Sequence, residues 1–374
     1  MNFNYFSEKI NGEVIFDVNS KNKIFEYIKN KKFIVFTSKS HTKRGQIKKI
    51  LNGINERNFH IIDRIDSHAG LDNIWDLYLK IKKIKFISKI DYVLAIGGGS
   101  VLDVSKILSI KSIYKKKFDN IKSLIQFLSQ SNDTVLSSYK FIAVPTTSGT
   151  SSELTKWSTV WDYENKKKLS ISNPNFSPEI IFYDPSLTLS LSKKNTIISA
   201  LDAFSHSLES IWNNNTSYYV INNASIAAKL IFSNLPKLIN DQKNIDYRSK
   251  IMLASYFAGK SFSITETSIA HALSYYITLE KNIPHGIACS FTLFQIVKLI
   301  EKNKKYKKIK PFLEDIFGKS PSKKLNLFFK KINIPIKFSY YGISLEDFNG
   351  IIKSAKESQR YKNSMIDLND FTYS

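Results

Sequence analysis

Residues 91–106, DYVLAIGGGSVLDVSK, join a short apolar run to an amphipathic stretch through three consecutive glycines. The apolar run predicts a buried strand, and the residues from Ser100 onward predict a helix. In such a turn the backbone amides and the helix N-terminus can face a phosphate group, and glycine allows the phosphate oxygens to approach closely. The spacing is not GxGxxG, and a plain tight turn explains it equally well on its own. The surroundings of the turn must therefore decide its function.

Outward from this turn, the first half of the chain alternates apolar runs with helix-like stretches. Further strand candidates are GEVIFDV, KKFIVFTS, FHIIDRI, KFIAVPTT and EIIFYD, at residues 12–18, 31–38, 59–65, 140–147 and 179–184. This alternation is typical of an α/β domain with a parallel sheet. From about Lys194 the pattern changes to long amphipathic helices without a strand series. We therefore expect an α/β domain over residues 1–188 and an all-helical domain over residues 189–374.

A second loop rich in hydroxyl groups follows another predicted strand. AVPTTSGTSSELT, residues 143–155, includes Thr146, Thr147, Ser148 and Thr150. A Ser/Thr-rich loop can simply cap a helix. Two such loops at the carboxyl ends of neighbouring strands are better explained by a dinucleotide site, because open α/β sheets bind ligands at that edge.

The helical half contains a group of residues that predicts a metal centre. Asp202 and His206 lie four apart in SALDAFSHSLESIW, so one helix face would carry both side chains, and SIAH and IPHG add His271 and His285. A single Asp-x-x-x-His pair is more often unrelated to metal. One carboxylate and three imidazoles together suit Fe(II) or Zn(II), with positions left for a substrate oxygen.

Composition limits the other classes of function. Lys and Arg outnumber Asp and Glu by 55 to 32, giving a formal charge of +23, but only five of the 55 are arginines. Nucleic-acid surfaces usually rely on arginine, so we expect a solvated lysine-rich surface and no nucleic-acid partner. No run of 18 apolar residues and no signal pattern occurs, and Cys289 is the single cysteine. We expect a cytoplasmic protein without a membrane span.

The motifs GGGSVLDVSK, PTTSGTSSE, LDAFSH and SIAH with PHG resemble, in this order, those of the iron-containing (group III) alcohol dehydrogenase family, from about residue 10 to at least residue 300. The resemblance implies a dehydroquinate synthase-like fold, NAD(H) or NADP(H), Fe2+ or Zn2+, and a homodimer or larger assembly. It implies that Asp202, His206, His271 and His285 bind the metal. The implied cofactor residues are Gly97, Gly98, Gly99, Ser100, Asp103, Thr146, Thr147 and, near the nicotinamide ribose, Lys168.

Two positions depart from the family pattern. Many members carry an Asp after the first strand of the nucleotide domain, where this chain has Ser38 in FTSKS, with Lys39 and Arg44 nearby. Loss of that negative charge makes NADPH a plausible cofactor. Many members also carry a further His four residues after the third ligand, where this chain has Tyr275. We expect Tyr275 to serve as the catalytic proton relay, although it could equally be a packing residue.

The stretches TSGTSSELTKWSTVWD, LESIWN and SIAHALSYYITLEKNIPHG look most similar to the phosphonoacetaldehyde reductase branch of the family. That branch implies reduction of phosphonoacetaldehyde to 2-hydroxyethylphosphonate, with Lys156, Lys260 and Arg360 as candidates for the phosphonate contact. Three alternatives stay open. They are a general short-chain alcohol dehydrogenase, a non-redox enzyme of the dehydroquinate synthase kind, and a non-catalytic binder of polyanions.

Overall fold

The structure is a computed structural model that describes residues 5–9, 12–66, 70–84, 87–130, 136–165 and 167–373. It divides into two compact units. Unit 1 comprises residues 1–147 and 152–188, and unit 2 comprises residues 148–151 and 189–374. The short segment 148–151 lies in the middle of the hydroxyl-rich loop and is grouped with the helices rather than with the sheet.

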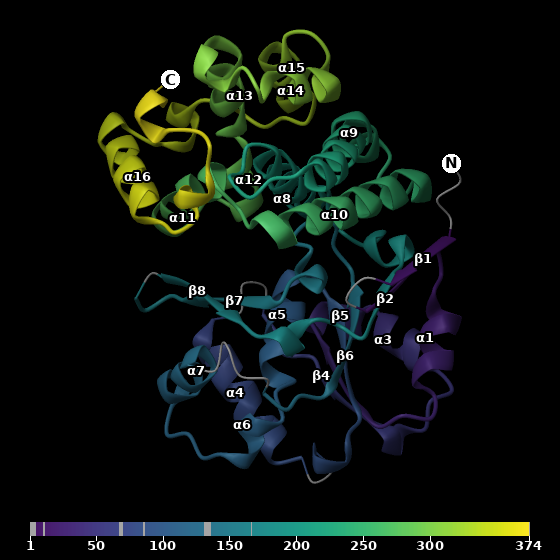
Figure 1. Cartoon of the computed structure of the whole chain (residues 1–374). Coiled ribbons are helices and arrows are strands. Elements are labelled where there is room, and N and C mark those ends of the chain that lie inside the picture. The colour runs from purple at the N-terminus through teal and green to yellow at the C-terminus, as the bar shows by residue number, and fades with distance from the viewer. Residues whose placement is uncertain are drawn as a thin grey trace. The chain divides into compact units, whose positions relative to one another are not determined.

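Unit 1 is built on a seven-stranded sheet in the order β1-β2-β9-β6-β5-β3-β4, drawn in purple to teal in Figure 1. The pair β1–β2 is antiparallel, and the other neighbours are parallel. The strands are β1 (Tyr5–Lys9), β2 (Glu13–Asp17), β3 (Phe33–Thr37), β4 (Phe59–Ile62), β5 (Tyr92–Gly97), β6 (Lys140–Pro145) and β9 (Ile180–Tyr183). The six apolar runs predicted as strands are β2 to β6 and β9, so the predicted α/β class is confirmed.

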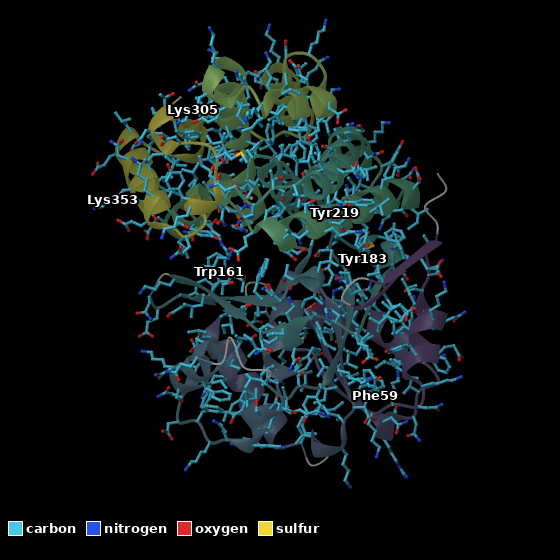
Figure 2. The ribbon with its side chains drawn as sticks, viewed as in Figure 1. Phe59, Trp161, Tyr183, Tyr219, Lys305 and Lys353 are labelled. Atoms are coloured by element: carbon cyan, nitrogen blue, oxygen red, sulfur yellow. The ribbon has the colours of Figure 1, made fainter. Side chains whose placement is uncertain are left out.

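The burial of the central strands of this sheet explains their apolar sequences. Every residue of β3 and β5 is buried, because a parallel strand with neighbours on both sides and helices over both faces has no solvated face. The helices of unit 1 are α1 (Lys21–Ile28), α2 (Lys39–Lys43), α3 (Gln46–Leu51), α4 (Leu71–Lys82), α5 (Gly99–Leu108), α6 (Ser112–Lys115) and α7 (Ile121–Gln130). Figure 2 shows Phe59 on β4, at the edge of the sheet, and Tyr183 at the carboxyl end of β9.

A two-stranded hairpin stands apart from the main sheet and was not predicted. Antiparallel β7 (Trp157–Asp162) and β8 (Lys167–Ser172) pair from Trp157 with Ser172 to Asp162 with Lys167. Figure 2 labels Trp161 on this hairpin. Only one of the six residues of β8 is buried, so its sequence lacks the apolar run that marks the other strands.

Unit 2 is built of helices, drawn in green to yellow in Figure 1. They are α8 (Lys193–Ile211), α9 (Tyr218–Asn240), α10 (Ile245–Thr265), α11 (Ile269–Lys281), α12 (His285–Ser290), α13 (Leu293–Lys302), α14 (Lys310–Phe317), α15 (Pro321–Lys331) and α16 (Leu345–Glu357). The predicted helical class of this half is confirmed. Among the described residues no helix is both long and apolar enough to cross a membrane.

Helix α8 is the central element of unit 2. Its N-cap Ser192 accepts a hydrogen bond from the Asn195 amide, and its residues from Ala200 to Ile211 are all buried. Two glycines allow other backbone segments to touch it. A Cβ on Gly149 would lie 2.5 Å from the Ser199 carbonyl oxygen, and one on Gly286 would lie 2.0 Å from that of Ile198. Both distances are too short for any side chain, so these two backbone contacts require glycine.

Candidate metal centre and dinucleotide site

Two of the four predicted ligands come from one face of α8. Asp202 and His206 are 6% and 5% exposed, and His206 Nε2 lies 3.7 Å from Asp202 Oδ1. The i, i+4 spacing in a helix brings the two side chains together, as the sequence predicted. Phe262 of α10 stacks on the His206 imidazole with ring centroids 4.1 Å apart, which holds that ring in place.

The other two predicted ligands arrive from two further helices. His271 lies in the first turn of α11, with Nε2 3.4 Å from Asp202 Oδ1, and His285 begins α12. The candidate ligand atoms of Asp202, His271 and His285 all lie within 4.8 Å of one another. The His206 ring stacks on that of His271 at 4.7 Å. All four predicted residues therefore belong to one cluster.

The electrostatics of this cluster favour a bound cation. Burial alone would raise the pKa of the Asp202 carboxyl, but the surrounding histidines hold that pKa far below its usual value. Burial also opposes protonation of His271, yet Glu209 and Asp202 outweigh it and raise the pKa of His271 to about 9. Positive charge at this point is stabilised, whether it comes from a proton or from a metal ion.

The residues fit a divalent metal. Nε2 of His271 is buried and makes no hydrogen bond within the described part of the chain, although it faces Asp202 Oδ1. Two buried acceptor atoms that face each other are unfavourable without a cation or a proton between them. A set of one carboxylate and three imidazoles suits Fe(II) or Zn(II). Asp202, His206, His271 and His285 would hold such an ion.

Sequence analysis missed two buried groups beside the candidate ligands. The carboxylate of Glu209, also on α8, pairs with Nδ1 of His271, and Cys289 Sγ lies 3.8 Å from Asp202 Oδ1. The spacing of Asp202, His206 and Glu209, at i, i+4 and i+7, is the signal that could have revealed the first. For Cys289 the position four residues after His285 is the corresponding signal.

Tyr275, the predicted proton relay, lies one turn after His271 on α11. Its ring stacks on that of His285, with centroids 6.3 Å apart and an angle of 17° between the planes. The side chain is half-buried. Its place beside a candidate ligand is compatible with the predicted role, which remains a prediction.

In unit 1 the glycine turn and the hydroxyl-rich loop meet at the carboxyl ends of β5 and β6. The Thr146 amide donates to the Gly97 carbonyl oxygen at 2.9 Å, and a Cβ on Gly98 would lie 3.0 Å from Thr147 Cγ2. A Cβ on Gly97 would lie 2.5 Å from Val101 Cβ, so glycine at this position permits the tight junction of β5 with α5. Gly99 and Ser100 form the first turn of α5, where helix amides can bind a phosphate.

Asp103, another predicted cofactor residue, is part of a buried network around Lys106. Ser152 Oγ donates to Asp103 Oδ1 at 2.6 Å. Lys106 is fully buried, and its Nζ donates to carbonyl and hydroxyl oxygens of residues 152–157 at 2.6 to 3.0 Å. Burial lowers the pKa of Lys106 to about 8, against the opposing charges of Asp103 and Glu153. Burial raises the pKa of the Asp103 carboxyl, although the positive charges of Lys106 and of Lys168 on β8 oppose this rise.

Ser38, at the end of β3, lies in a polar cluster that includes a histidine missed by the sequence analysis. Ser38 Oγ lies 3.0 Å from Ser40 Oγ, and Arg44 Nη2 lies 3.5 Å from Ser40 Oγ. His41 connects this cluster to the second loop, because its Nε2 lies 3.1 Å from Thr146 Oγ1. The structure thus joins the predicted cofactor residues Ser38 and Thr146, which are far apart in sequence.

The three candidates for a phosphonate contact occupy different surroundings. Lys156 is exposed in unit 1. Lys260 of α10 lies over the rings of Tyr219 and Tyr256, 5.6 and 5.4 Å from their centroids. Arg360 forms an ion pair with Glu266, just before the helix that carries His271. Lys260 and Arg360, both in unit 2, thus have different partners.

Sequence profiles of known families decide the classification. The profile of iron-containing alcohol dehydrogenases matches residues 11–185, and that of the Fe-containing alcohol dehydrogenase family, C-terminal, matches residues 196–370. The chain belongs to the iron-containing alcohol dehydrogenase family. The resemblance inferred from its motifs is therefore confirmed.

Individual relatives of this chain differ in the substrate that their names state. Phosphonoacetaldehyde reductase of Streptomyces viridochromogenes is 28% identical over 56% of this chain and 53% of its own length. Sulfoacetaldehyde reductase of Bilophila wadsworthia is 31% identical over 54% of this chain and 50% of its own length. The chain thus spans about half the length of these two relatives. NADPH-dependent butanol dehydrogenase of Clostridium saccharobutylicum is 26% identical over 88% of this chain and 85% of its own.

A solved structure of a reductase shares the fold of this chain. It is the sulfoacetaldehyde reductase from Bifidobacterium kashiwanohense in complex with NAD+, with a TM-score of 0.83, 23% identity, and coverage of 96% of this chain and 93% of that one.

Proposed function

We propose that this iron-containing alcohol dehydrogenase reduces a small anionic aldehyde with NAD(P)H, and that the aldehyde is phosphonoacetaldehyde. The observation that carries the proposed chemistry is the cluster of the buried Asp202, His206 and His271 with the half-buried His285. In the reaction, a hydride adds to the carbonyl carbon, the carbon–oxygen π bond breaks, and a proton joins the oxygen. The aldehyde, NAD(P)H and a proton thus give the alcohol and NAD(P)+.

Each part of the chain has a role in this proposal. When bound, Fe2+ or Zn2+ supplies Lewis-acid polarisation of the carbonyl, and the nicotinamide supplies the hydride. Gly97, Gly98 and the first turn of α5 bind the pyrophosphate through backbone amides. Tyr275 Oη donates the proton, and its stacking on His285 fixes its ring beside the ligands.

Arg360 is the residue that we assign to the substrate anion. Its guanidinium pairs with Glu266, and Asn363 Nδ2 donates to the Thr267 carbonyl oxygen at 3.0 Å. The segment that carries Arg360 is therefore attached to the residues that lead into α11 and His271. A guanidinium has five N–H donors and matches phosphonate or sulfonate oxygens well, so one carboxylate partner does not exhaust it. Lys260 lies two residues before Phe262 on α10, so their side chains lie on different faces of this helix. Phe262 is the residue that stacks on His206.

Substrate preference tests the proposal. For iron-loaded protein prepared without oxygen, we expect kcat/KM for phosphonoacetaldehyde to exceed that for butanal at least about tenfold, because a charge-assisted contact contributes about 1.5 to 3 kcal/mol. Arg360→Leu should remove most of this preference. Lys260→Met, which deletes a cation over two tyrosines, is the matched control and should keep it. Initial rates of NADPH oxidation with each aldehyde measure this preference for the wild type and for both variants.

Other substrate profiles point to the remaining candidates. Equal or higher rates with butanal would favour a general short-chain alcohol dehydrogenase, the function suggested by the butanol dehydrogenase that matches 88% of the chain. A preference for sulfoacetaldehyde would support the proposed contact with an anionic group, but that group would be a sulfonate and not a phosphonate. Absence of nicotinamide turnover with any aldehyde would contradict the redox proposal and favour a non-redox enzyme or a binding protein.

We also propose that NADPH is preferred over NADH. A carboxylate after the first nucleotide-domain strand binds the ribose hydroxyls of NAD, whereas an arginine accommodates the 2′-phosphate of NADP. This chain has Ser38 there, with Ser40 and Arg44 in the same polar cluster. Arg44 is exposed at this place, where it can pair with a phosphate.

Ser38→Asp should reverse this preference. A carboxylate beside the 2′-phosphate introduces like-charge repulsion of a few kcal/mol, so kcat/KM with NADPH should fall about 10- to 100-fold while that with NADH changes little. Ser38→Ala, which removes the hydroxyl without adding charge, is the control and should retain the NADPH preference. If both variants show the wild-type ratio of NADPH to NADH activity, the ribose does not bind beside Ser38.

A further inference from the structure

Glu209 is a fully buried carboxylate that the proposed reaction does not use directly. It lies on α8, on the same face as Asp202 and His206, and is 0% exposed. Burying a carboxylate is costly unless it is well hydrogen-bonded or paired. Its contacts therefore indicate what it does.

One oxygen of Glu209 binds the N-terminal end of α11. Oε1 accepts hydrogen bonds from the amides of Ser268 and His271, both at 3.1 Å, and from Ser268 Oγ at 3.2 Å. Ser268 is the N-cap of α11 but makes no side-chain capping bond of its own. Glu209 thus caps, from a neighbouring helix, the helix whose first turn carries His271.

The other oxygen of Glu209 determines the protonation pattern of the His271 ring. Oε2 pairs with Nδ1 of His271. A carboxylate only accepts hydrogen bonds, so Nδ1 must carry a proton. In the neutral imidazole Nε2 then has its lone pair available, and this is the atom that faces Asp202 Oδ1.

We propose that Glu209 is a positioning residue that makes His271 a metal ligand through Nε2, by fixing its tautomer, its ring orientation and the start of α11. The inference rests on the proposed metal centre. A carboxylate that accepts the second N–H of a ligating histidine also makes that histidine a stronger donor, and losing such a partner typically costs about 10- to 100-fold in metal affinity.

Glu209→Gln tests this assignment with almost no change in volume. The amide oxygen of glutamine would stay with the three donors from Ser268 and His271, so its NH2 group would face Nδ1. Nδ1 would then become an acceptor, and the proton would move to Nε2, where it blocks metal binding. We expect the dissociation constants for Zn2+ and Co2+, measured by chelator competition, to rise about 10- to 100-fold. The Co2+ absorption spectrum should also change.

Two matched controls separate this effect from a general loss of stability. Glu153→Gln makes the same substitution at another buried glutamate, in unit 1, which accepts a hydrogen bond from Tyr183. Ser268→Ala removes one donor to Glu209 but leaves its pairing with His271. Both variants should keep dissociation constants within about threefold of wild type. A Glu209→Gln protein that unfolds like wild type and binds Zn2+ as tightly would overturn the inference.

A measurement on the unmodified chain covers the case in which Glu209→Gln does not fold. In protein labelled with 15N-histidine and loaded with Zn2+, the His271 ring should show a protonated Nδ1 and a metal-bound Nε2. A metal-bound Nδ1 would contradict the inference. If the wild type binds neither Zn2+ nor Co2+, the proposed metal centre itself fails, which distinguishes the two failures.

Discussion

His271→Ala should lose tight metal binding and aldehyde reduction together. The substitution removes a candidate ligand whose Nε2 faces Asp202 and leaves Glu209 buried without its histidine partner. Lewis-acid polarisation is worth several kcal/mol, and about 4 kcal/mol corresponds to roughly a thousandfold in rate. We therefore expect kcat to fall at least about a thousandfold, with Zn2+ affinity measured in parallel by chelator competition. His285→Ala should behave in the same way.

Tyr275→Phe is the control for this experiment because it lies on the same helix, one turn after His271. It should keep wild-type metal affinity and lose about 100- to 10,000-fold in kcat, the contribution typical of a general acid. Full activity of His271→Ala in protein stripped of metal would refute the metal-dependent mechanism. Full activity of Tyr275→Phe would leave the metal centre intact and assign Tyr275 to packing.

Lys106→Met should strongly destabilise unit 1. The ammonium group is fully buried and donates to the backbone carbonyls of Ser152, Thr155 and Trp157. Methionine preserves much of the volume but leaves these oxygens without their donor and Asp103 without its nearby cation. Removing one partner of a buried charged set costs about 3 to 5 kcal/mol. We expect the free energy of unfolding to fall by this amount in urea titrations followed by the fluorescence of the tryptophans.

The control for Lys106→Met is Lys49→Met, at an exposed lysine on α3 of the same unit. It should change the free energy of unfolding by less than about 0.5 kcal/mol, as is usual for surface positions. A similarly small effect for Lys106→Met would show that the loop over residues 152–157 is held by other contacts. The motif GGGSVLDVSK thus has two parts with different tasks: its glycines are the residues proposed to bind the cofactor, and its lysine anchors the neighbouring loop.

Features with a regular spacing or a continuous apolar run could be predicted from the sequence. Strands β3 and β5 are buried on both faces and therefore appear as unbroken apolar runs. Asp202 and His206 share a helix face because they are four apart. The hairpin of β7 and β8 was not predicted because it lies outside the main sheet and only one of the six residues of β8 is buried, which leaves no apolar run in β8.

The partners of a side chain could not be predicted where they lie far away in the sequence, even where its spacing places it on the right helix face. Glu209 pairs with a histidine 62 positions later, and His41 contacts Thr146 across 105 positions. The partners of Lys106 are mostly backbone carbonyl oxygens, which every residue possesses, so no side-chain pattern could mark them. These contacts exist only after the parallel sheet and the helical unit have formed.

The two glycine contacts on α8 have a consequence for which ion the proposed metal centre would hold. Gly149 and Gly286 place backbone against the helix at Ser199 and Ile198, about one turn before Asp202, so rigid main chain rather than the ion fixes this part of the cluster. A centre already assembled in this way can exchange ions without refolding. The affinities of protein sites for divalent metals follow a common order, so geometry and metal supply decide which metal occupies a site. The ion recovered with the protein should then reflect the metals available to the cell that made it.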